Sequence, residues 1–235
     1  MKQINLILQS KGGVGKSLFI WFVAQIEKDR KTNFIDLDES TQTSAARLGT
    51  VVGNDRVRPV RILNEYNKME RDQIVGLLES LAHGKSDQYF IDFGAPESAE
   101  FLRLLTGDIT GAELYHAMLE LGAELRFFVI VAGRDALPSC VNYYNDISKA
   151  LDSIPVTMVV NMGTFNGTES AEKAIASLTQ LGYAPIKRFG DLGSGAAVKE
   201  IIDLISQPNP DPATMGLLAR MVYKKKQVEI EEIIA

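Results

Sequence analysis

The feature that most constrains this chain is the segment Ser10-Lys11-Gly12-Gly13-Val14-Gly15-Lys16-Ser17. An apolar run at residues 4–8 precedes it, and residues 18–24 after it have the pattern of a helix. A strand, a glycine-rich turn and a helix that opens on Gly-Lys-Ser are typical of a loop that holds nucleotide phosphates. The glycines let the backbone N–H groups turn inward around a polyphosphate, and the helix adds its own free N–H groups.

Two lysines in this loop have different expected roles. Lys16 is placed to reach the β- and γ-phosphates, and Ser17 to bind Mg²⁺. The general pattern has glycine at its first position, whereas this chain has Ser10 followed by Lys11. This K-G-G-V-G-K-S form resembles the deviant Walker A loop of the ParA/MinD family of ATPases. The resemblance implies a dimer that sandwiches ATP, with Lys11 contacting the nucleotide of the partner subunit. The nucleotide-binding residues would be Gly12, Gly13, Val14, Gly15, Lys16 and Ser17.

Short apolar runs alternate with helical patterns along the whole chain. We expect strands near residues 4–9, 33–37, 58–63, 89–93, 126–132, 156–161 and 184–189. We expect helices near residues 16–28, 72–82, 97–105, 111–121, 137–151, 170–181 and 195–205. This order predicts an α/β protein with a mostly parallel twisted sheet and helices on both faces, a P-loop NTPase architecture. One domain over residues 1–235 is expected, with a last helix from about Ala213.

Ligands of parallel sheets lie beyond the carboxyl ends of the strands, so acidic residues there are candidates. The second strand ends in Asp36 and Asp38. In the ParA/MinD family a similar D-x-D motif is commonly followed by Pro-Gln, whereas this chain has Glu39. The resemblance implies that Asp38 positions the attacking water and that Asp36 supports the Mg²⁺ side. The alternative is a solvated acidic turn.

Two later strand ends complete the expected site. Tyr89-Phe90-Ile91-Asp92 resembles a Walker B strand, so Asp92 would hold a Mg²⁺-bound water, and residues 94–96 resemble the second switch. By the same resemblance, Asn161 would hydrogen-bond the adenine edge, since an amide supplies both a donor and an acceptor. Asn is also common where strands end in turns. The loop at residues 190–195 passes over the base or is a plain glycine-rich connection.

Composition excludes several classes of protein. The 235 residues are 46% hydrophobic, with a net charge of −5, so binding to nonspecific DNA would need a local basic patch. One cysteine, Cys140, permits no internal disulfide, and with two histidines it cannot fill a tetrahedral zinc site. We find no signal peptide and no apolar run long enough for a membrane span, so we expect a soluble cytoplasmic protein.

Further residues resemble the plasmid-encoded branch of the family, the conjugation and stability proteins of the TraL and StbB type. They are residues 8–17, 91–96, 119–125 and 128–133. The resemblance implies a slow ATPase that acts as a switch in plasmid partition, positioning or transfer, with a plasmid DNA-binding or transfer protein as partner. Two alternatives stay open: a MinD-like ATPase on a membrane surface, and a metabolic ligase of similar fold. An iron–sulfur carrier is excluded, because one cysteine per chain cannot supply four ligands to a cluster shared by two subunits.

Two basic clusters allow more than one interpretation. Lys224-Lys225-Lys226 lies in the C-terminal helical pattern and is either a surface for membrane or DNA, or a solvated run on a packed helix before an acidic tail. Arg56, Arg58 and Arg61 are expected on or near the third strand. There they would share one face or protect an exposed edge.

Overall fold

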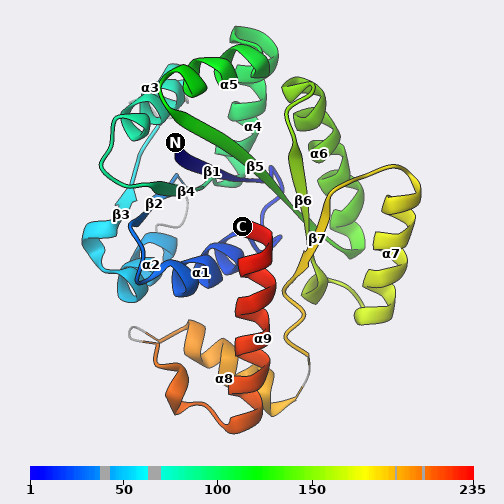
Figure 1. Cartoon of the computed structure of the whole chain (residues 1–235). Coiled ribbons are helices and arrows are strands. Elements are labelled where there is room, and N and C mark those ends of the chain that lie inside the picture. Colours follow the sequence, from blue (N-terminus) through cyan, green and yellow to red (C-terminus); the bar gives the residue numbers. More distant parts are fainter. Residues whose placement is uncertain (38–42, 63–69, 194, 208–209) are drawn as a thin grey trace.

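The computed structural model describes residues 1–37, 43–62, 70–193, 195–207 and 210–235. Its centre is a twisted seven-stranded sheet with the strand order β3-β2-β4-β1-β5-β6-β7 (Figure 1). Each neighbouring pair of strands is parallel. The strands are β1 (Lys2–Leu8), β2 (Thr32–Asp36), β3 (Val57–Pro59), β4 (Gln88–Asp92), β5 (Ala123–Ala132), β6 (Val156–Asn161) and β7 (Ile186–Phe189).

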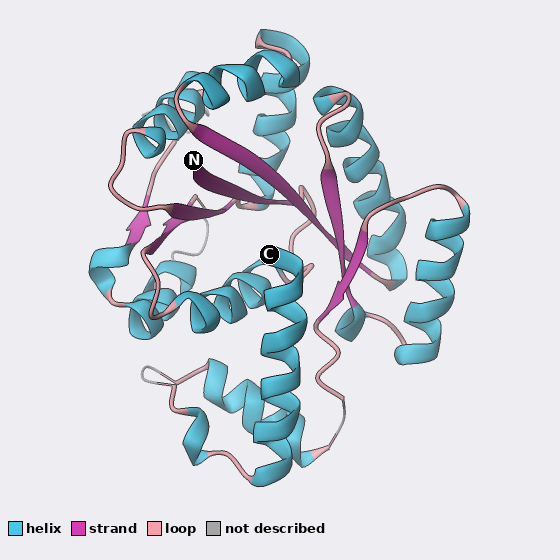
Figure 2. Cartoon of the chain, viewed as in Figure 1, coloured by secondary structure: helices cyan, strands magenta, loops and turns pink. Residues whose placement is uncertain are grey.

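Helices surround this sheet, as Figure 2 shows by colour. They are α1 (Lys16–Glu27), α2 (Thr43–Val52), α3 (Arg71–Ala82), α4 (Ala95–Arg103), α5 (Gly111–Glu120), α6 (Leu137–Leu151), α7 (Thr168–Gln180), α8 (Ala196–Ile205) and α9 (Leu217–Ile234). In one group α1 packs on α2 and α9, and α9 packs on α8. In the other, α3 and α6 each contact α4 and α5. Right-handed crossovers explain the two groups, because connections that run in opposite directions along a parallel sheet place their helices on opposite faces.

The predicted fold class is confirmed, since the sheet is parallel and lies between helices. Its central strands are apolar and buried; Leu6, Ile7 and Leu8 of β1 have no exposed surface. Helix α1 runs beneath the sheet and is itself mostly buried, with Phe19 and Phe22 in the core. The P-loop therefore connects two of the most deeply buried elements of the molecule.

The largest differences from the predicted elements lie at the β3 edge. Helix α2 was not predicted, because its sequence TSAARLGTVV is rich in residues with weak helix propensity. It forms because Leu48 and Val52, one turn apart, are both buried. Strand β3 has three residues, so Arg56 lies before it, in the short helix η1 (Asn54–Arg56), and Arg61 lies after it.

These differences correct the hypothesis that the three arginines share one face of a strand. The Arg56 guanidinium donates to the backbone oxygens of Glu27 at 2.8 Å and Thr32 at 2.9 Å, and also to that of Lys28. Helix α1 ends here, so a cation meets the negative end of its dipole. Arg56 therefore has a structural role at the end of α1.

The predicted C-terminal helix begins at Leu217, preceded by the short helix η5 (Pro212–Thr214). Of its three lysines, Lys226 is buried and its Nζ donates to Glu229 at 2.8 Å. Lys224 and Lys225 are exposed. In the described part of the chain, no helix combines the length and apolarity required to cross a bilayer.

Candidate nucleotide site

The P-loop connects the carboxyl end of β1 to the first turn of α1. Gly13 and Gly15 have left-handed φ angles of +73° and +103°, which glycine adopts without the strain that a side chain would add. Lys11, Gly12 and Gly13 are exposed, and a Cβ added at Gly12 or Gly13 would meet no atom within 4 Å. The loop thus leaves open space at the amino end of α1, where the first helical N–H groups have no partner within the helix.

Lys16 is buried at the base of this loop, and its Nζ donates to the backbone oxygen of Gln9 at 2.9 Å. Gln9 is itself fully buried and accepts from the Lys11 N–H through Oε1 at 3.2 Å. Its Nε2 donates to the Ile130 oxygen of β5 at 2.9 Å. Gln9 therefore holds both ends of the loop against the sheet.

Cys140 lies in the first turns of α6, close to the two P-loop lysines. Burial raises the pKa of its thiol, while a backbone hydrogen bond with Ala132 and the charges of Lys16 and Lys11 oppose that increase. Its backbone oxygen accepts from Gln9 Nε2 at 3.4 Å. The thiol is fully buried, so its place in the structure is that of a small core residue.

Ser17 and Asp92 meet beside the loop, where the predicted Mg²⁺ ligands should lie. The Ser17 hydroxyl donates to Asp92 Oδ2 at 3.4 Å, and the Asp92 carboxylate is 2% exposed. Gly94 follows as the residue before α4, and the Gln9 N–H donates to Ser98 of that helix at 3.1 Å. The segment after β4 is thus tied directly to the start of the P-loop.

Asp36, the third predicted metal-side residue, ends β2 next to β4. Its Oδ2 accepts from the Ala45 N–H of α2 at 2.8 Å, so this carboxylate stabilises the start of α2. Asp38 and Glu39, which carry the predicted first switch, lie outside the described residues. The described part of the chain contains no cluster of three or more His, Cys, Asp or Glu side chains suited to a metal ion. Any Mg²⁺ here would therefore be held by Ser17, Asp36, Asp92 and the phosphates together.

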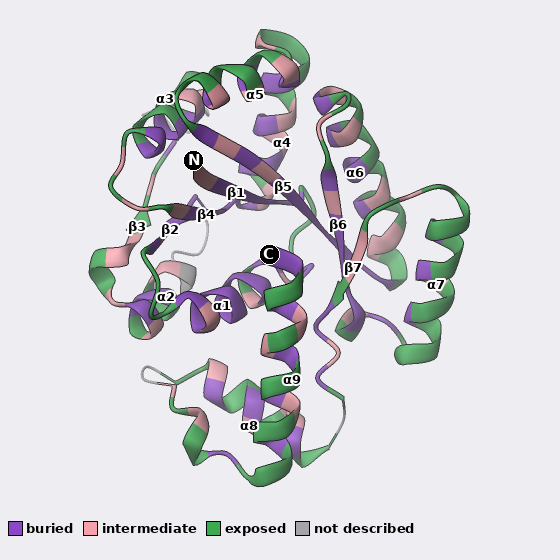
Figure 3. Ribbon diagram, viewed as in Figure 1, coloured by how far each residue is buried: buried purple, intermediate pink, exposed green. Residues whose placement is uncertain are grey.

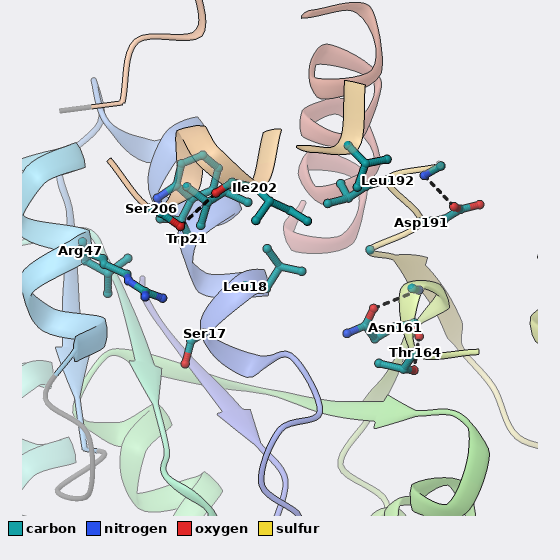
Figure 4. A pocket seen from close by; sticks show the side chains of 16 residues that line it. Ser17, Leu18, Trp21, Arg47, Asn161, Thr164, Asp191, Leu192, Ile202 and Ser206 are labelled. Atoms are coloured by element: carbon teal, nitrogen blue, oxygen red, sulfur yellow. Dashed lines mark hydrogen bonds between the residues drawn. The ribbon is translucent and has the colours of Figure 1, made fainter. Parts of the chain in front are cut away.

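A cavity of about 450 Å³ opens from Ser17 along α1 (Figure 4). One wall carries Leu18 and Trp21 of α1, and the facing wall carries Ile202 of α8. Asn161 and Thr164 lie at one end, next to the turn that contains Asp191. The cavity is polar near the strand ends and apolar between α1 and α8.

Asn161 joins this cavity to the P-loop. Its Nδ2 donates to the Val14 backbone oxygen at 2.9 Å, and its Oδ1 accepts from the Gly163 N–H at 3.2 Å. Gly15 and Gly190 pack so closely around the amide that a Cβ on either would come within 2.2 Å of it. The predicted adenine residue therefore lines the cavity and also fixes the backbone of the phosphate loop.

Comparisons with known proteins agree with this arrangement. No protein-family model matches the chain. Over 148 residues the chain is 28% identical to Protein TraL of Escherichia coli; the match covers 63% of this chain and 58% of TraL, less than two thirds of that relative's length. The structure matches that of a protein described as a plasmid partition protein, from Borrelia burgdorferi B31 and bound to AMPPNP. That match has a TM-score of 0.54, 14% identity, and coverage of 100% of this chain and 99% of the other.

The chain shares its fold with that Borrelia burgdorferi protein. At 14% identity this likeness shows the P-loop NTPase fold, and the predicted resemblance to TraL and to partition proteins is confirmed.

Sequence reasoning missed two parts of the site. It gave no role to Gln9, although a polar residue at the end of an apolar strand, next to the loop, was a usable signal. It also gave no cavity residue to α8, because the face of α8 that lines the cavity has the apolar spacing of any packed helix.

Proposed function

We propose that this protein binds ATP with Mg²⁺ and works as a dimeric switch in plasmid partition, positioning or conjugative transfer. ATP would bring two copies together, and slow hydrolysis would separate them again. TraL and the partition protein bound to AMPPNP support the plasmid context and the nucleotide.

The phosphates would occupy the open space at Gly12 and Gly13, where the loop N–H groups and the start of α1 favour anions. Lys16 would exchange its bond to the Gln9 oxygen for the β- and γ-phosphates. Ser17 would bind Mg²⁺ directly, and Asp92 would hold a water of that ion. A Mg²⁺ ion held by these residues would supply positive charge against the charge that builds up on the phosphates during transfer.

The remaining residues divide between the base, the water and the second copy. Asn161 would accept a hydrogen bond from the adenine amino group through the lone pair of Oδ1 that Gly163 does not use. Asp36 would support the Mg²⁺ side, and Asp38 would position the attacking water. Lys11, exposed at the front of the loop, would contact the nucleotide of the second copy.

One observation carries this proposal: the Ser17 hydroxyl and the Asp92 carboxylate meet at 3.4 Å beside an open glycine loop. A strand-end carboxylate, a helix-start hydroxyl and a buried lysine in one place are the parts that phosphoryl transfer needs. The proposed partner is a plasmid DNA-binding or transfer protein. Binding to nonspecific DNA would appear as an ATP-dependent gel shift that weakens steeply with salt.

The test is calorimetric titration with ATP and Mg²⁺, followed by size-exclusion chromatography with ATP, with ADP and without nucleotide. We expect binding, and a dimer with ATP alone. Lys16→Ala should weaken ATP binding roughly 100-fold, because it removes a charged donor from two phosphates. Lys11→Ala should bind ATP normally yet fail to form the ATP dimer.

Lys31→Ala is the matched control. Lys31 is exposed and lies just before β2, at the amino ends of the strands, whereas the P-loop lies at their carboxyl ends. It should behave as the wild type does. If the wild-type protein did not bind ATP, the proposed function would be contradicted. A Lys11→Ala protein that dimerises normally would remove only the role of Lys11.

A further inference from the structure

Burial changes abruptly where β1 ends. Figure 3 shows most of β1 as buried, and Gln9, the residue directly after it, has no exposed surface. The four residues that follow, 10–13, are all exposed. A buried amide is unfavourable unless its polar atoms find partners, so the hydrogen bonds of Gln9 indicate what its side chain does at this boundary.

Both polar atoms of the Gln9 side chain are hydrogen-bonded. Nε2 donates to the backbone oxygens of Ile130 at 2.9 Å and of Cys140 at 3.4 Å, and Oε1 accepts from the Lys11 N–H at 3.2 Å. The pairing of β1 with β5 ends at Leu8, so the amide supplies a hydrogen bond to β5 where the ladder stops. A buried polar network with satisfied members is rigid. The Gln9 side chain therefore connects β5 and α6 to the backbone of Lys11.

The two lysines of the P-loop depend on different parts of Gln9. Lys16 Nζ donates to the backbone oxygen of Gln9, which is present whatever side chain residue 9 carries. The Lys11 N–H donates to the side chain, so this bond requires an acceptor of that length and points toward the sheet. In the part of the chain that the structure describes, the N–H groups of Gly12 and Gly13 have no hydrogen-bond partner, so they stay available to an anion.

We propose that Gln9 is the positioning residue for Lys11, because its side chain fixes the Lys11 backbone at the exposed front of the loop. The inference rests on the proposed function, in which Lys11 contacts the nucleotide of a second copy. Without the Gln9 amide, the Lys11 backbone would become ordered only when two copies associate. That ordering costs conformational entropy once in each copy, so it weakens the dimer twice. Nucleotide binding by one copy loses less, because Lys16 keeps its place.

Gln9→Met tests this role, since methionine fills a similar volume but does not hold the Lys11 N–H. Calorimetry with ADP and Mg²⁺ measures nucleotide binding by one copy, because we expect no dimer with ADP. Sedimentation with ATP and Mg²⁺ over a range of concentrations measures the dissociation constant of the dimer. We expect the ADP affinity to fall only roughly threefold and the ATP dimer to weaken roughly tenfold or more.

Asn5→Leu is the matched control. Asn5 is fully buried in β1, four residues before Gln9, and its Nδ2 donates to the Tyr89 backbone oxygen at 3.0 Å. This substitution also removes a buried amide from the end of a hydrogen bond, but away from the loop. Its ADP affinity and its ATP dimer should both stay close to the wild-type values. An ATP dimer weakened as much by Asn5→Leu as by Gln9→Met would reduce the effect to a general loss of structure and overturn the proposal.

A measurement on the wild type decides the matter if Gln9→Met does not fold. Without nucleotide, the Lys11 N–H should exchange with solvent roughly tenfold or more slowly than the Gly12 N–H, after correction for intrinsic rates, because only the former is hydrogen-bonded. NMR resolves the two amides. Equal exchange rates would overturn the proposal, and so would an ATP dimer of Gln9→Met as stable as that of the wild type.

Failure of this inference is distinguishable from failure of the proposed function. A wild-type protein that stays monomeric with ATP would contradict the proposed dimeric switch, and the role of Gln9 would fall with it. A wild type that dimerises with ATP, beside a Gln9→Met protein that does so equally well, would contradict the role of Gln9 alone.

Discussion

In the proposed nucleotide site, the phosphate end is one continuous segment, residues 9–17, whereas the base end is assembled from segments far apart in the sequence. At the phosphate end, bonds within the segment, such as Lys16 to Gln9, define the loop. At the base end, α1, β6, the turn after β7 and helix α8 all contribute residues to the cavity wall. The two ends meet at Asn161, whose amide donates to the Val14 oxygen.

This difference has a consequence for the effects of substitutions. A local loop is sensitive to backbone conformation, because its glycines adopt angles that other residues resist. A cavity assembled from several elements is sensitive to the contacts between those elements. Many small contacts contribute to it, so the loss of any one of them has a small effect. Changes in the loop and at Asn161 should therefore cost most, and changes in the far wall least.

The largest effect is expected for Gly15→Ala. This position combines a left-handed φ of +103° with a Cβ that would approach Asn161 Nδ2 to 2.2 Å. Strain and overpacking together should lower the free energy of unfolding by about 3 kcal/mol, measured by urea denaturation without nucleotide. Gly13 also has a positive φ, but a Cβ there would meet no atom within 4 Å. Gly13→Ala should therefore lower the free energy of unfolding by only about 1 kcal/mol.

Gly12→Ala is the matched control, since Gly12 has neither a positive φ nor a neighbour within 4 Å. It should change stability by less than about 0.5 kcal/mol. Introducing Gly15→Ala into an Asn161→Ala background should cost less than in the wild type, because the clash is gone. Equal costs in the two backgrounds would show that Gly15 and Asn161 are not coupled.

The second prediction concerns Asn161→Ala, which tests whether the two ends are coupled. Removing the amide releases the Val14 oxygen, so affinity for tripolyphosphate, which has no base, should fall roughly tenfold. The preference for ATP over inosine triphosphate should also fall, because inosine lacks the amino group that Oδ1 would accept from. Calorimetry with the three ligands measures both effects.

Each half of that prediction can fail alone. Unchanged tripolyphosphate affinity would mean that the bond to Val14 contributes nothing to phosphate binding. An unchanged preference for ATP would mean that Asn161 does not read the base. Thermal unfolding of the variant, followed by circular dichroism, separates either result from a general loss of structure.

The same contrast explains what the sequence alone could predict. Residues 10–17, Asp92 and the parallel sheet follow from local patterns: a glycine loop between a strand and a helix, and apolar runs that end in a carboxylate. The pairing of Asn161 with Val14 joins residues 147 positions apart, and no local pattern encodes it. Helix α2 was missed for the same reason, since burial of Leu48 and Val52 rather than propensity stabilises it. The structural role of Arg56 likewise depends on where the end of α1 lies in space.

A smaller effect is expected for Ser17→Ala, because it removes one ligand of an ion that keeps its phosphate and water ligands. In the wild type, ATP should bind more tightly with Mg²⁺ than with EDTA. In Ser17→Ala that difference should shrink by roughly tenfold, while affinity in EDTA stays close to the wild-type value. Thr at this position is the conservative control and should preserve the effect of Mg²⁺. A variant that responds to Mg²⁺ as the wild type does would place the ion elsewhere.

The smallest effect is expected at the far wall. Ile202 of α8 lines the cavity but is 51% exposed, so Ile202→Ala should change the free energy of unfolding by about 0.5 kcal/mol or less. Trp21, the only tryptophan in the sequence, lies on the opposite wall, and its fluorescence reports binding directly. ATP should change that fluorescence in both proteins, with affinities within about twofold of each other, because the polar contacts to the base lie at the strand ends. An affinity loss above tenfold for Ile202→Ala would mean that α8 contacts the base or sugar directly. Binding at the base end would then depend on this one wall as strongly as binding at the phosphate end depends on the loop.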